Sequence, residues 1–452
     1  MASPAYRTAP LKTHKMPPGI LYIVGNEAAE RFSYYGMNSI LVIFMTKYLL
    51  DAQGHPHYLT EAQADTWYHA FTACAYILPV LGAFLADAIL GKYRTILLLS
   101  IVYCFGHFAL AINDTRLGLL VGLGLIALGA GGIKPCVSAN VGDQFGPSNQ
   151  HLLPRVFSWF YFSINFGSAF STLLIPALLD RCGPRLAFGT PGLFMVIATV
   201  VFWVGRKKIV HIPPVGVSLY VKEVFQRENL KALGNLLILV PFAAIFWALW
   251  QQNFSSWVIQ ADKMDRHFLG TEWLPSQIQT VNPIFILLML PLFSYLVYPG
   301  IDRIFRLTPL RKMGIGFFLT AFAFVIVGWI QTRLDAGQSP NIIWQLLAFV
   351  VLTAAEVMVS VTHLEFAYTQ APKKMKSLVM CTYLGSVSVG NFFTAGVNFF
   401  IQNPDGSVKL AGARYFFFFA AVMFVTALLF VVVARFYRGQ TSIQDEAAAQ
   451  PG

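Results

Sequence analysis

Long apolar stretches recur along the whole chain and constrain its fold more than any other feature. A helix needs about 20 apolar residues to cross the hydrocarbon core of a membrane. The sequence predicts twelve such spans, at residues 19–49, 64–90, 95–112, 117–140, 154–178, 187–205, 233–260, 278–300, 313–332, 342–368, 377–402 and 413–437. Only 12% of the 452 residues are charged, about half the share in soluble domains. We therefore expect an all-α integral membrane protein, and the composition excludes a disordered chain or a small disulfide-stapled domain.

The basic residues are distributed unevenly between the two sides of the membrane. If the N-terminus is cytoplasmic, the inner connections carry 21 of the 32 lysines and arginines, and the outer connections carry nine. The positive-inside rule describes this bias. The net charge of +11 therefore indicates orientation, and we expect no nucleic-acid partner.

The longest connection, at residues 206–232, divides the spans into two sets of six. We expect a cytoplasmic tail at 1–18 without a cleavable signal peptide, a helical bundle at 19–205, a cytoplasmic linker without extra helices at 206–232, a second bundle at 233–437 and a cytoplasmic tail at 438–452. Asp87 and Asp302, each followed by basic residues, end spans 2 and 8, as internal duplication would produce. This organisation favours two bundles around a site at the membrane midplane.

The first span carries charged side chains at membrane depth. At 100° per residue, one face about 100° wide holds Glu27, Glu30, Arg31, Tyr34 and Asn38. Such a stripe cannot face lipid. Two interpretations remain open: an ion-pair cluster that only holds the bundle together, or the wall of a functional cavity.

Two further charged residues fall inside predicted spans. Lys134 follows the small-residue run Gly129–Gly132 and is either a functional cation or a lysine that snorkels to the inner interface. Glu356 lies in the middle of its span with no cation in its own turn. It requires a positive charge from the protein, a substrate or a proton.

Uncharged polar and aromatic residues accompany these charges inside the spans. They are His69, Tyr76, Asn165, Trp247, Gln251 and Asn282. An interhelical hydrogen bond explains any single one of the polar residues, whereas the combination indicates a polar cavity with aromatic walls.

The segment Gly25–Met37 strongly resembles the E-x-x-E-R-F-x-Y-Y motif of the proton-dependent oligopeptide transporter (POT or PTR) family, which belongs to the major facilitator superfamily. The resemblance continues through Gly82–Arg94, Gly131–Ser138, Phe157–Gly167, Phe246–Leu249 and residues 365–372. It implies the major facilitator fold, with twelve transmembrane helices in two pseudo-symmetric six-helix bundles, and a bacterial peptide transporter.

The resemblance also implies roles for individual residues. A part in proton coupling is expected of Glu27, Glu30, Arg31, Lys134 and His69. Substrate binding is expected of Arg31, Tyr34, Tyr76, Lys134, Asn165, Trp247, Asn282, Glu356 and Tyr383, with Glu356 facing the peptide ammonium group. Gating is expected at Asn38 and Gln251.

The sequence departs from the pattern of many members at four positions. Asn38 and Gln251 stand where an arginine and an aspartate pair, so a hydrogen bond replaces that ion pair or no contact remains. Asn235 stands where a helix 7 cation is expected opposite Glu356, which therefore lacks its usual partner. Tyr383 stands where tryptophan is common.

These features predict a symporter that imports di- and tripeptides with protons by alternating access. We expect peptides, protons and membrane lipid as partners, the proton as coupling ion, and no cofactor, metal or nucleotide. We also expect the protein to act as a monomer. We expect it in the cell membrane, specifically a bacterial inner membrane, with both termini on the cytoplasmic side. Three alternatives remain: a transporter of nitrate or another small anion, an intramembrane enzyme, although no nucleophile–base pair accompanies the carboxylates, and a binding protein that does not translocate.

Overall fold

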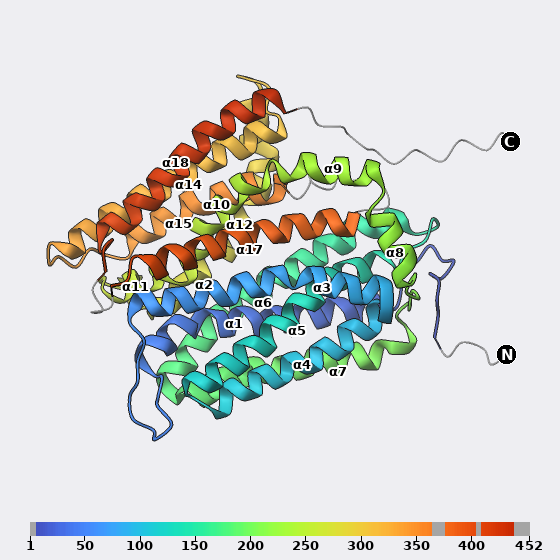
Figure 1. Ribbon diagram of the computed structural model, residues 1–452, viewed down its shortest axis with the longest axis horizontal. Helices are drawn as coiled ribbons and strands as arrows, with labels where there is room; N and C mark the ends of the chain where they lie inside the picture. Colours follow the sequence, from blue (N-terminus) through green and yellow to red (C-terminus); the bar gives the residue numbers. More distant parts are fainter. Residues whose placement is uncertain (1–5, 364–375, 404–407, 438–452) are drawn as a thin grey trace.

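The computed structural model describes residues 6–363, 376–403 and 408–437, and its helices pack side by side along one common direction (Figure 1). The first half contains α1 Ile20–Lys47, α2 Glu61–Ile77, α3 Pro79–Phe84, η1 Leu85–Leu90, α4 Lys92–Ile112, α5 Arg116–Gly142, η2 Gln150–Leu152, α6 Leu153–Cys182, α7 Pro184–Val204 and η3 Gly205–Lys207. The connecting segment contains α8 Val217–Val224 and α9 Arg227–Leu237. The second half contains α10 Val240–Trp250, η4 Gln251–Phe254, α11 Ser256–Asp262, β1 His267–Phe268, β2 Thr271–Glu272, η5 Pro275–Thr280, α12 Val281–Leu292, η6 Phe293–Val297, α13 Tyr298–Asp302, α14 Pro309–Asp335, α15 Ile343–Glu356, η7 Val357–Val361, α17 Lys376–Phe400 and α18 Ala413–Phe436.

Each of the twelve predicted spans corresponds to helix in the described part of the chain. Nine described helices are long and apolar enough to cross a membrane by length and composition alone. The other three spans are α1, which carries three charged residues in its first half, the segment α10–η4–α11 and α17. The end of the tenth predicted span, beyond residue 363, lies outside the described residues.

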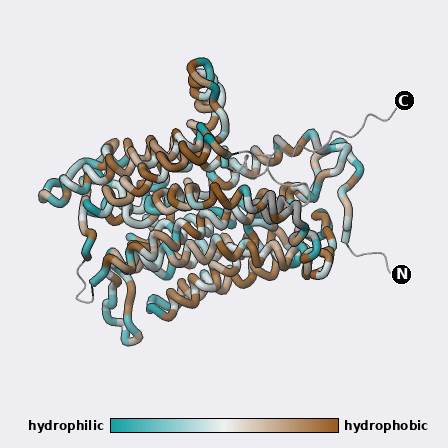
Figure 2. Tube along the Cα trace, turned by 45° about the horizontal axis from the view of Figure 1, so that its top comes forward, coloured by the Kyte–Doolittle hydropathy of each residue, from teal (hydrophilic) through white to brown (hydrophobic). Residues whose placement is uncertain are grey.

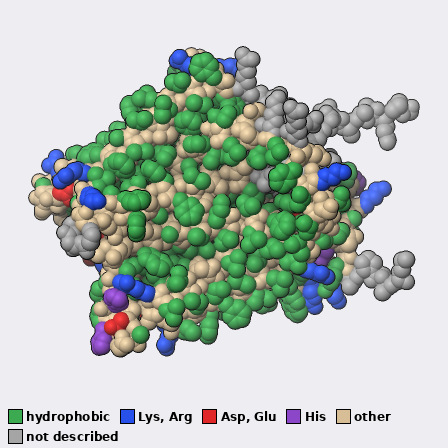
Figure 3. Space-filling view, viewed as in Figure 1, with side chains coloured by type: hydrophobic (Ala, Val, Ile, Leu, Met, Phe, Trp, Pro, Cys, Tyr) green, Lys and Arg blue, Asp and Glu red, His purple; other side chains and the backbone are tan. Residues whose placement is uncertain are grey.

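The surface of the molecule has the polarity that a bilayer demands. Apolar residues dominate the middle of the helices, and hydrophilic residues gather toward their ends (Figure 2). The face seen in Figure 3 is covered by apolar side chains, with most lysines and arginines near its ends. Phe105 and Phe108 are each 61% exposed and Leu288 is 62% exposed, which would be costly in water but suits contact with lipid.

The helices form two bundles, one in each half of the chain. In the first, α4 packs along α5, and α1 packs along α6 and α7. In the second, α14 packs along α18 and α15, and α10 packs along α17. The pairing of α2 with α17 joins the two bundles. Helix α1 begins and α18 ends at the same end of the molecule (Figure 1), and we call the opposite end the distal end.

Close helix packing beside the candidate site depends on glycine. A Cβ atom on Gly82 of α3 would lie 2.1 Å from the carbonyl oxygen of Gly132 in α5 and 2.6 Å from its Cα. Only hydrogen fits there, because the obstacle is backbone and cannot rotate away. The small-residue run before Lys134 therefore lets the second span lie directly against α5.

The connecting segment differs from the linker without extra helices that the sequence predicts. It contains α8, of 8 residues, and α9, of 11 residues, which continues toward the second bundle. Both are far shorter than the roughly 20 residues that a crossing helix needs. The segment thus contains short helices but no additional span.

Three π-helical turns interrupt the described helices, and two of them fall at corresponding places in the two halves. The segment η1 ends the second predicted span, and η6 lies near the end of the eighth, six spans later. The third, η7, directly follows Glu356. Turns of this kind are uncommon. Because the first two occur at corresponding places in the two halves, they support an internal repeat.

A short hairpin, β1–β2, lies in the connection after α11 and is tied to the start of α15. The Asn341 side chain donates to Asp265 Oδ2 over 2.9 Å, and the His267 backbone N–H donates to Asp265 Oδ1 over 3.1 Å. Hydrogen bonds from Asn341 and His267 lower the pKa of Asp265 to about 2.

Candidate functional site

A buried ion-pair cluster lies in the first half of α1. Arg31 Nε lies 2.8 Å from Glu27 Oε1 and 2.7 Å from Glu30 Oε2, and the three residues are at most 9% exposed. The helical period brings Glu27 and Arg31 together because they are four residues apart. Two carboxylates share one guanidinium, so the cluster has one negative charge in excess when both acids are ionised.

Lys134 lies near this cluster but is held by aromatic rings. Its Nζ atom is 4.1 Å from the ring centre of Tyr34 in α1 and 3.9 Å from that of Tyr76 in α2. It has no hydrogen-bond partner among the described residues. Cation–π attraction stabilises the charge while the three N–H donors stay available to another acceptor.

Glu356 is held by neutral donors from two other elements. Trp250 Nε1 donates to Glu356 Oε2 over 2.9 Å, and Asn282 Nδ2 donates to the same oxygen over 2.8 Å. Asn282 also reaches Thr353 Oγ1 at 3.1 Å. The sequence predicts Asn282 and Glu356 as site residues but not Trp250. The only sequence signal for Trp250 is its position three residues after Trp247.

Aromatic residues of the second bundle surround this carboxylate. The Trp247 ring meets the rings of Trp250 and Tyr383 edge to face, with centroids 5.4 Å and 6.1 Å apart. Tyr383 Oη lies 3.0 Å from Ser360 Oγ. Trp247, Trp250 and Tyr383 therefore form an aromatic cluster beside Glu356. Asn165 of α6 instead donates to the Tyr161 carbonyl oxygen of its own helix at 3.0 Å.

Asn38 and Gln251 meet through a residue that the sequence reasoning missed. Asn38 Nδ2 donates to Tyr68 Oη over 3.1 Å, and Tyr68 Oη donates to Gln251 Oε1 over 3.2 Å. We call these three residues the tyrosine latch. It joins α1 and α2 to η4 and therefore connects the bundles, so hydrogen bonds stand where the family resemblance expects an ion pair.

His69 is fully buried and lies between the bundles, one residue beyond the tyrosine latch. Its Nδ1 is 2.7 Å from Asn391 Oδ1, and its Nε2 is 3.1 Å from Ser255 Oγ. Asn391 Nδ2 donates to Val387 O over 2.8 Å, which orients Oδ1 toward the ring. His69 therefore contacts residues of the second bundle, and its described hydrogen bonds do not include Glu27, Glu30 or Lys134.

Direct contacts between the bundles continue toward the distal end. These contacts are Ser388–Ala73, Thr172–Thr280, Gln277–Leu173, Gln402–Thr66, Lys263–Glu61 and Lys47–Asp262. Lys47, Glu61 and Thr66 lie at or near the distal ends of α1 and α2, and Thr172 and Leu173 lie in the distal half of α6, whereas Ser388–Ala73 lies near the middle of the second and eleventh spans. Together with the tyrosine latch, they hold the distal ends of the bundles together.

The site thus presents opposite charges from the two bundles. The first bundle contributes Arg31 and Lys134, and the second contributes Glu356. Within the described residues, no group of three or more His, Cys, Asp or Glu side chains could hold a metal ion. The motif at 365–372 lies outside the described residues.

The chain is similar to known proteins over most of its length. A family model described as PTR2, POT family, matches residues 93–226 and 218–414. "Peptide transporter family 1" of Drosophila melanogaster is 37% identical over 366 residues, which are 71% of this chain and 48% of that protein. "Solute carrier family 15 member 2" of Rattus norvegicus is 36% identical over 398 residues, 77% of this chain and 53% of that protein. The chain spans about half the length of these curated relatives.

Solved structures match nearly end to end. The in meso crystal structure of the POT family transporter PepTSo is 35% identical, with a TM-score of 0.86, covering 94% of this chain and 99% of that one. The crystal structure of an auto-inhibited POT family peptide transporter is 34% identical, with a TM-score of 0.85, covering 95% and 99%. The names of these relatives and structures describe transporters, not enzymes.

Proposed function

Because the chain belongs to the POT family, we propose that it imports di- and tripeptides together with protons, driven by the proton electrochemical gradient. One observation carries the proposal: two cations within spans of the first bundle and one carboxylate within a span of the second have signs that complement the two charges of a peptide zwitterion. Arg31 and Lys134 attract the peptide carboxylate, and Glu356 attracts its ammonium group. The aromatic residues around Glu356 accept varied side chains without reading them closely.

Proton coupling follows from competition for Arg31. While the guanidinium contacts Glu27 and Glu30, it favours their ionised forms. A peptide carboxylate that draws Arg31 away leaves two buried acids without a counter-charge, and proton uptake then relieves the cost. Lys134, with no hydrogen-bond partner among the described residues, is available to the same carboxylate. Release of the peptide reverses both steps.

The driving force is sufficient for accumulation. One proton moving through 100 mV gains about 2.3 kcal/mol, and each pH unit adds about 1.4 kcal/mol. Their sum supports a concentration ratio of roughly two to three orders of magnitude for a neutral peptide.

Alternating access requires the bundles to separate at one end and close at the other. The distal contacts, including the tyrosine latch, fit a state closed on that side. We assign the distal side to the exterior, since the basic residues then lie mainly on the cytoplasmic side with both termini. A single chain in the cell membrane, for which we propose a bacterial inner membrane, suffices for this cycle.

Uptake of dialanine into proteoliposomes tests the proposal. An inside-negative potential or an acidic exterior should drive accumulation, and no dependence on either gradient would refute symport. Glu27→Gln should abolish driven uptake and retain counterflow, because peptide still binds while proton exchange is lost. Glu272→Gln, an exposed acid of the hairpin, is the matched control and should behave as the unchanged protein. Displacement of dialanine by nitrate would instead favour an anion transporter.

A further inference from the structure

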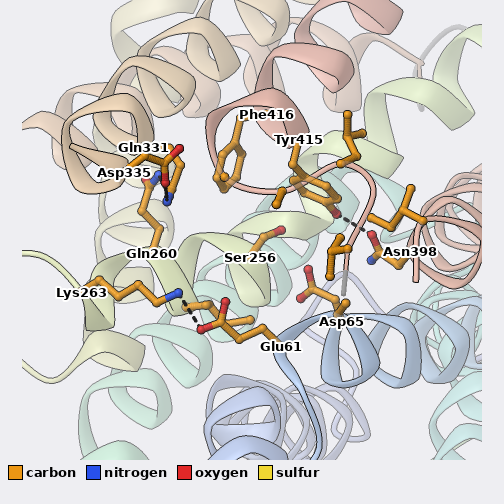
Figure 4. Close-up of a pocket in the computed structure, with 17 residues that line it drawn as sticks. Glu61, Asp65, Ser256, Gln260, Lys263, Gln331, Asp335, Asn398, Tyr415 and Phe416 are labelled. Carbon is orange, nitrogen blue, oxygen red and sulfur yellow. Dashed lines mark hydrogen bonds and ion pairs between the residues drawn. The ribbon is translucent and has the colours of Figure 1, made fainter. Parts of the chain in front are cut away.

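A cavity lies between the distal ends of the bundles, away from the site described above. It has a volume of about 250 Å³ (Figure 4). Helix α2 of the first bundle contributes Glu61 and Asp65. Helices α11, α14, α17 and α18 of the second bundle line the rest, together with Lys263, Ile401 and residues between 408 and 412. Anything bound here would contact both bundles.

Among the described residues that line the cavity, one charged group has an atom without a hydrogen-bond partner. Lys263 pairs with Glu61 at 2.6 Å. Asp335 accepts the Gln331 side-chain amide at 2.9 Å and a backbone N–H of α18 at 2.8 Å. Asp65 is 5% exposed, and its Oδ1 atom has no hydrogen-bond partner among the described residues.

The hydroxyl groups beside Asp65 are engaged elsewhere. Ser255 and Ser256 both lie next to its carboxyl group. Ser256 Oγ donates to Gln252 Oε1 over 3.1 Å. Since Nδ1 of His69 faces the Asn391 oxygen and carries the ring proton, Nε2 of the neutral ring accepts the hydroxyl proton of Ser255 at 3.1 Å. The Oδ1 atom of Asp65 is therefore left as an unmatched acceptor, which is costly in a buried site.

A second unmatched group faces the same cavity and has the opposite polarity. Asn398 is 1% exposed, and its Nδ2 atom has no hydrogen-bond partner among the described residues. Its Oδ1 atom accepts from Tyr415 Oη over 2.8 Å, which orients the amide group (Figure 4). The cavity therefore offers one anionic acceptor and one neutral donor.

We propose that this cavity binds a small organic ammonium ion that also carries a hydroxyl or carbonyl oxygen. The ammonium group donates to Asp65, and the oxygen accepts from Asn398. The described residues provide no group of three His, Cys, Asp or Glu side chains for a metal ion, whereas an ammonium group needs one carboxylate. A molecule of about four heavy atoms fits easily, since one water occupies about 30 Å³ of liquid volume.

Binding at this place would hold the distal ends together. The ligand bridges Asp65 of the first bundle and Asn398 of the second, and it must leave before the bundles separate there. From outside it should therefore lower the maximal rate of transport without competing with the transported substrate.

Calorimetric titration of the full chain in lipid nanodiscs, at constant ionic strength, tests the site with ethanolamine as the probe. Ethylene glycol is the neutral control of equal size, and ethylamine is the control without the oxygen. We expect ethanolamine to bind at least 10-fold more tightly than ethylene glycol. Asp65→Asn should weaken the binding of ethanolamine at least 10-fold. Asp335→Asn, in the same cavity, should change the affinity for ethanolamine less than 2-fold.

A second variant keeps the test decisive if Asp65→Asn does not fold. Asn398→Ala should remove the preference for ethanolamine over ethylamine and retain ethylamine binding. Equal binding of ethanolamine and ethylene glycol, unchanged binding in either variant, or no binding by the unchanged protein would overturn the proposal. These measurements need no transport, so they stand apart from the outcome of the peptide uptake experiment.

Discussion

Replacing Tyr68 with phenylalanine tests whether the tyrosine latch holds the bundles together. The hydroxyl accepts from Asn38 at 3.1 Å and donates to Gln251 at 3.2 Å. Only the second bond crosses between the bundles. Tyr68→Phe keeps the ring, which is fully buried, and removes both hydrogen bonds. Asn38 and Tyr68 belong to the same bundle, so loss of their bond does not affect the contact between bundles. Loss of the bond to Gln251 does.

The size of the effect follows from the bond that crosses between bundles. Hydrogen bonds between membrane helices contribute about 0.6 kcal/mol on average and at most about 1.7 kcal/mol. Loss of the bond between Tyr68 and Gln251 should shift the ratio of distally closed to distally open molecules about 3-fold, with an upper bound near 18-fold. The double variant Tyr68→Phe with Gln251→Leu should add little to the single change, because the same contact is removed.

Spin labels on the distal ends measure this ratio. Ala52 and Ala336 are exposed at the distal ends of different bundles, and labelled cysteines at these positions report their separation once the five native cysteines are replaced. Tyr68→Phe should increase the long-distance population. Tyr103→Phe is the matched control, since Tyr103 is buried within the first bundle and its hydroxyl has no partner among the described residues. Identical distance distributions for all three proteins would refute the reasoning.

Three other changes test separate parts of the structure. Gly82→Ala forces a Cβ atom to within 2.1 Å of the α5 backbone and should lower the free energy of unfolding by about 1–3 kcal/mol. A Cβ atom on Gly124 meets nothing within 4 Å, so Gly124→Ala is the control and should not lower it. Trp250→Phe removes one donor to the α15 carboxylate and should raise the KM for free-amine peptides several-fold; Trp257→Phe, whose Nε1 lacks a partner among the described residues, should leave KM unchanged. Because the pKa of Asp265 is lowered to about 2, protection of its hairpin from hydrogen exchange should be full above pH 4 and lost toward pH 2, and Asp265→Asn should abolish this dependence.

The features that could be predicted from sequence are those encoded locally. Apolar length identifies each span without reference to its neighbours, so the helix positions could be inferred one at a time. The contact of Arg31 with Glu27 and Glu30 follows from the helical period alone. The small residues before Lys134 are typical of close helix packing, and the structure identifies the partner as Gly82.

Contacts between distant segments could not be predicted in this way. The sequence identified Asn38 and Gln251 as replacements for an ion pair, but 30 residues separate Asn38 from Tyr68 and 183 separate Tyr68 from Gln251. The pairing of Trp250 with Glu356 likewise depends on how two helices are rotated relative to each other. Period and hydropathy give no information on such rotations, and Tyr68 and Trp250 looked like ordinary apolar-span aromatics.

The tyrosine latch is neutral and therefore responds to salt differently from the ion pairs at the distal end. Lys263 and Glu61 are 46% and 55% exposed, so dissolved salt screens their attraction, with a Debye length near 3 Å at 1 M. The hydroxyl and amide groups of the latch carry no net charge and are buried, which leaves screening little to act on. Raising the ionic strength should therefore weaken the ion pairs at the distal end before it affects the tyrosine latch. It is a reversible way to remove the charged contacts between the bundles while the neutral hydrogen bonds stay intact.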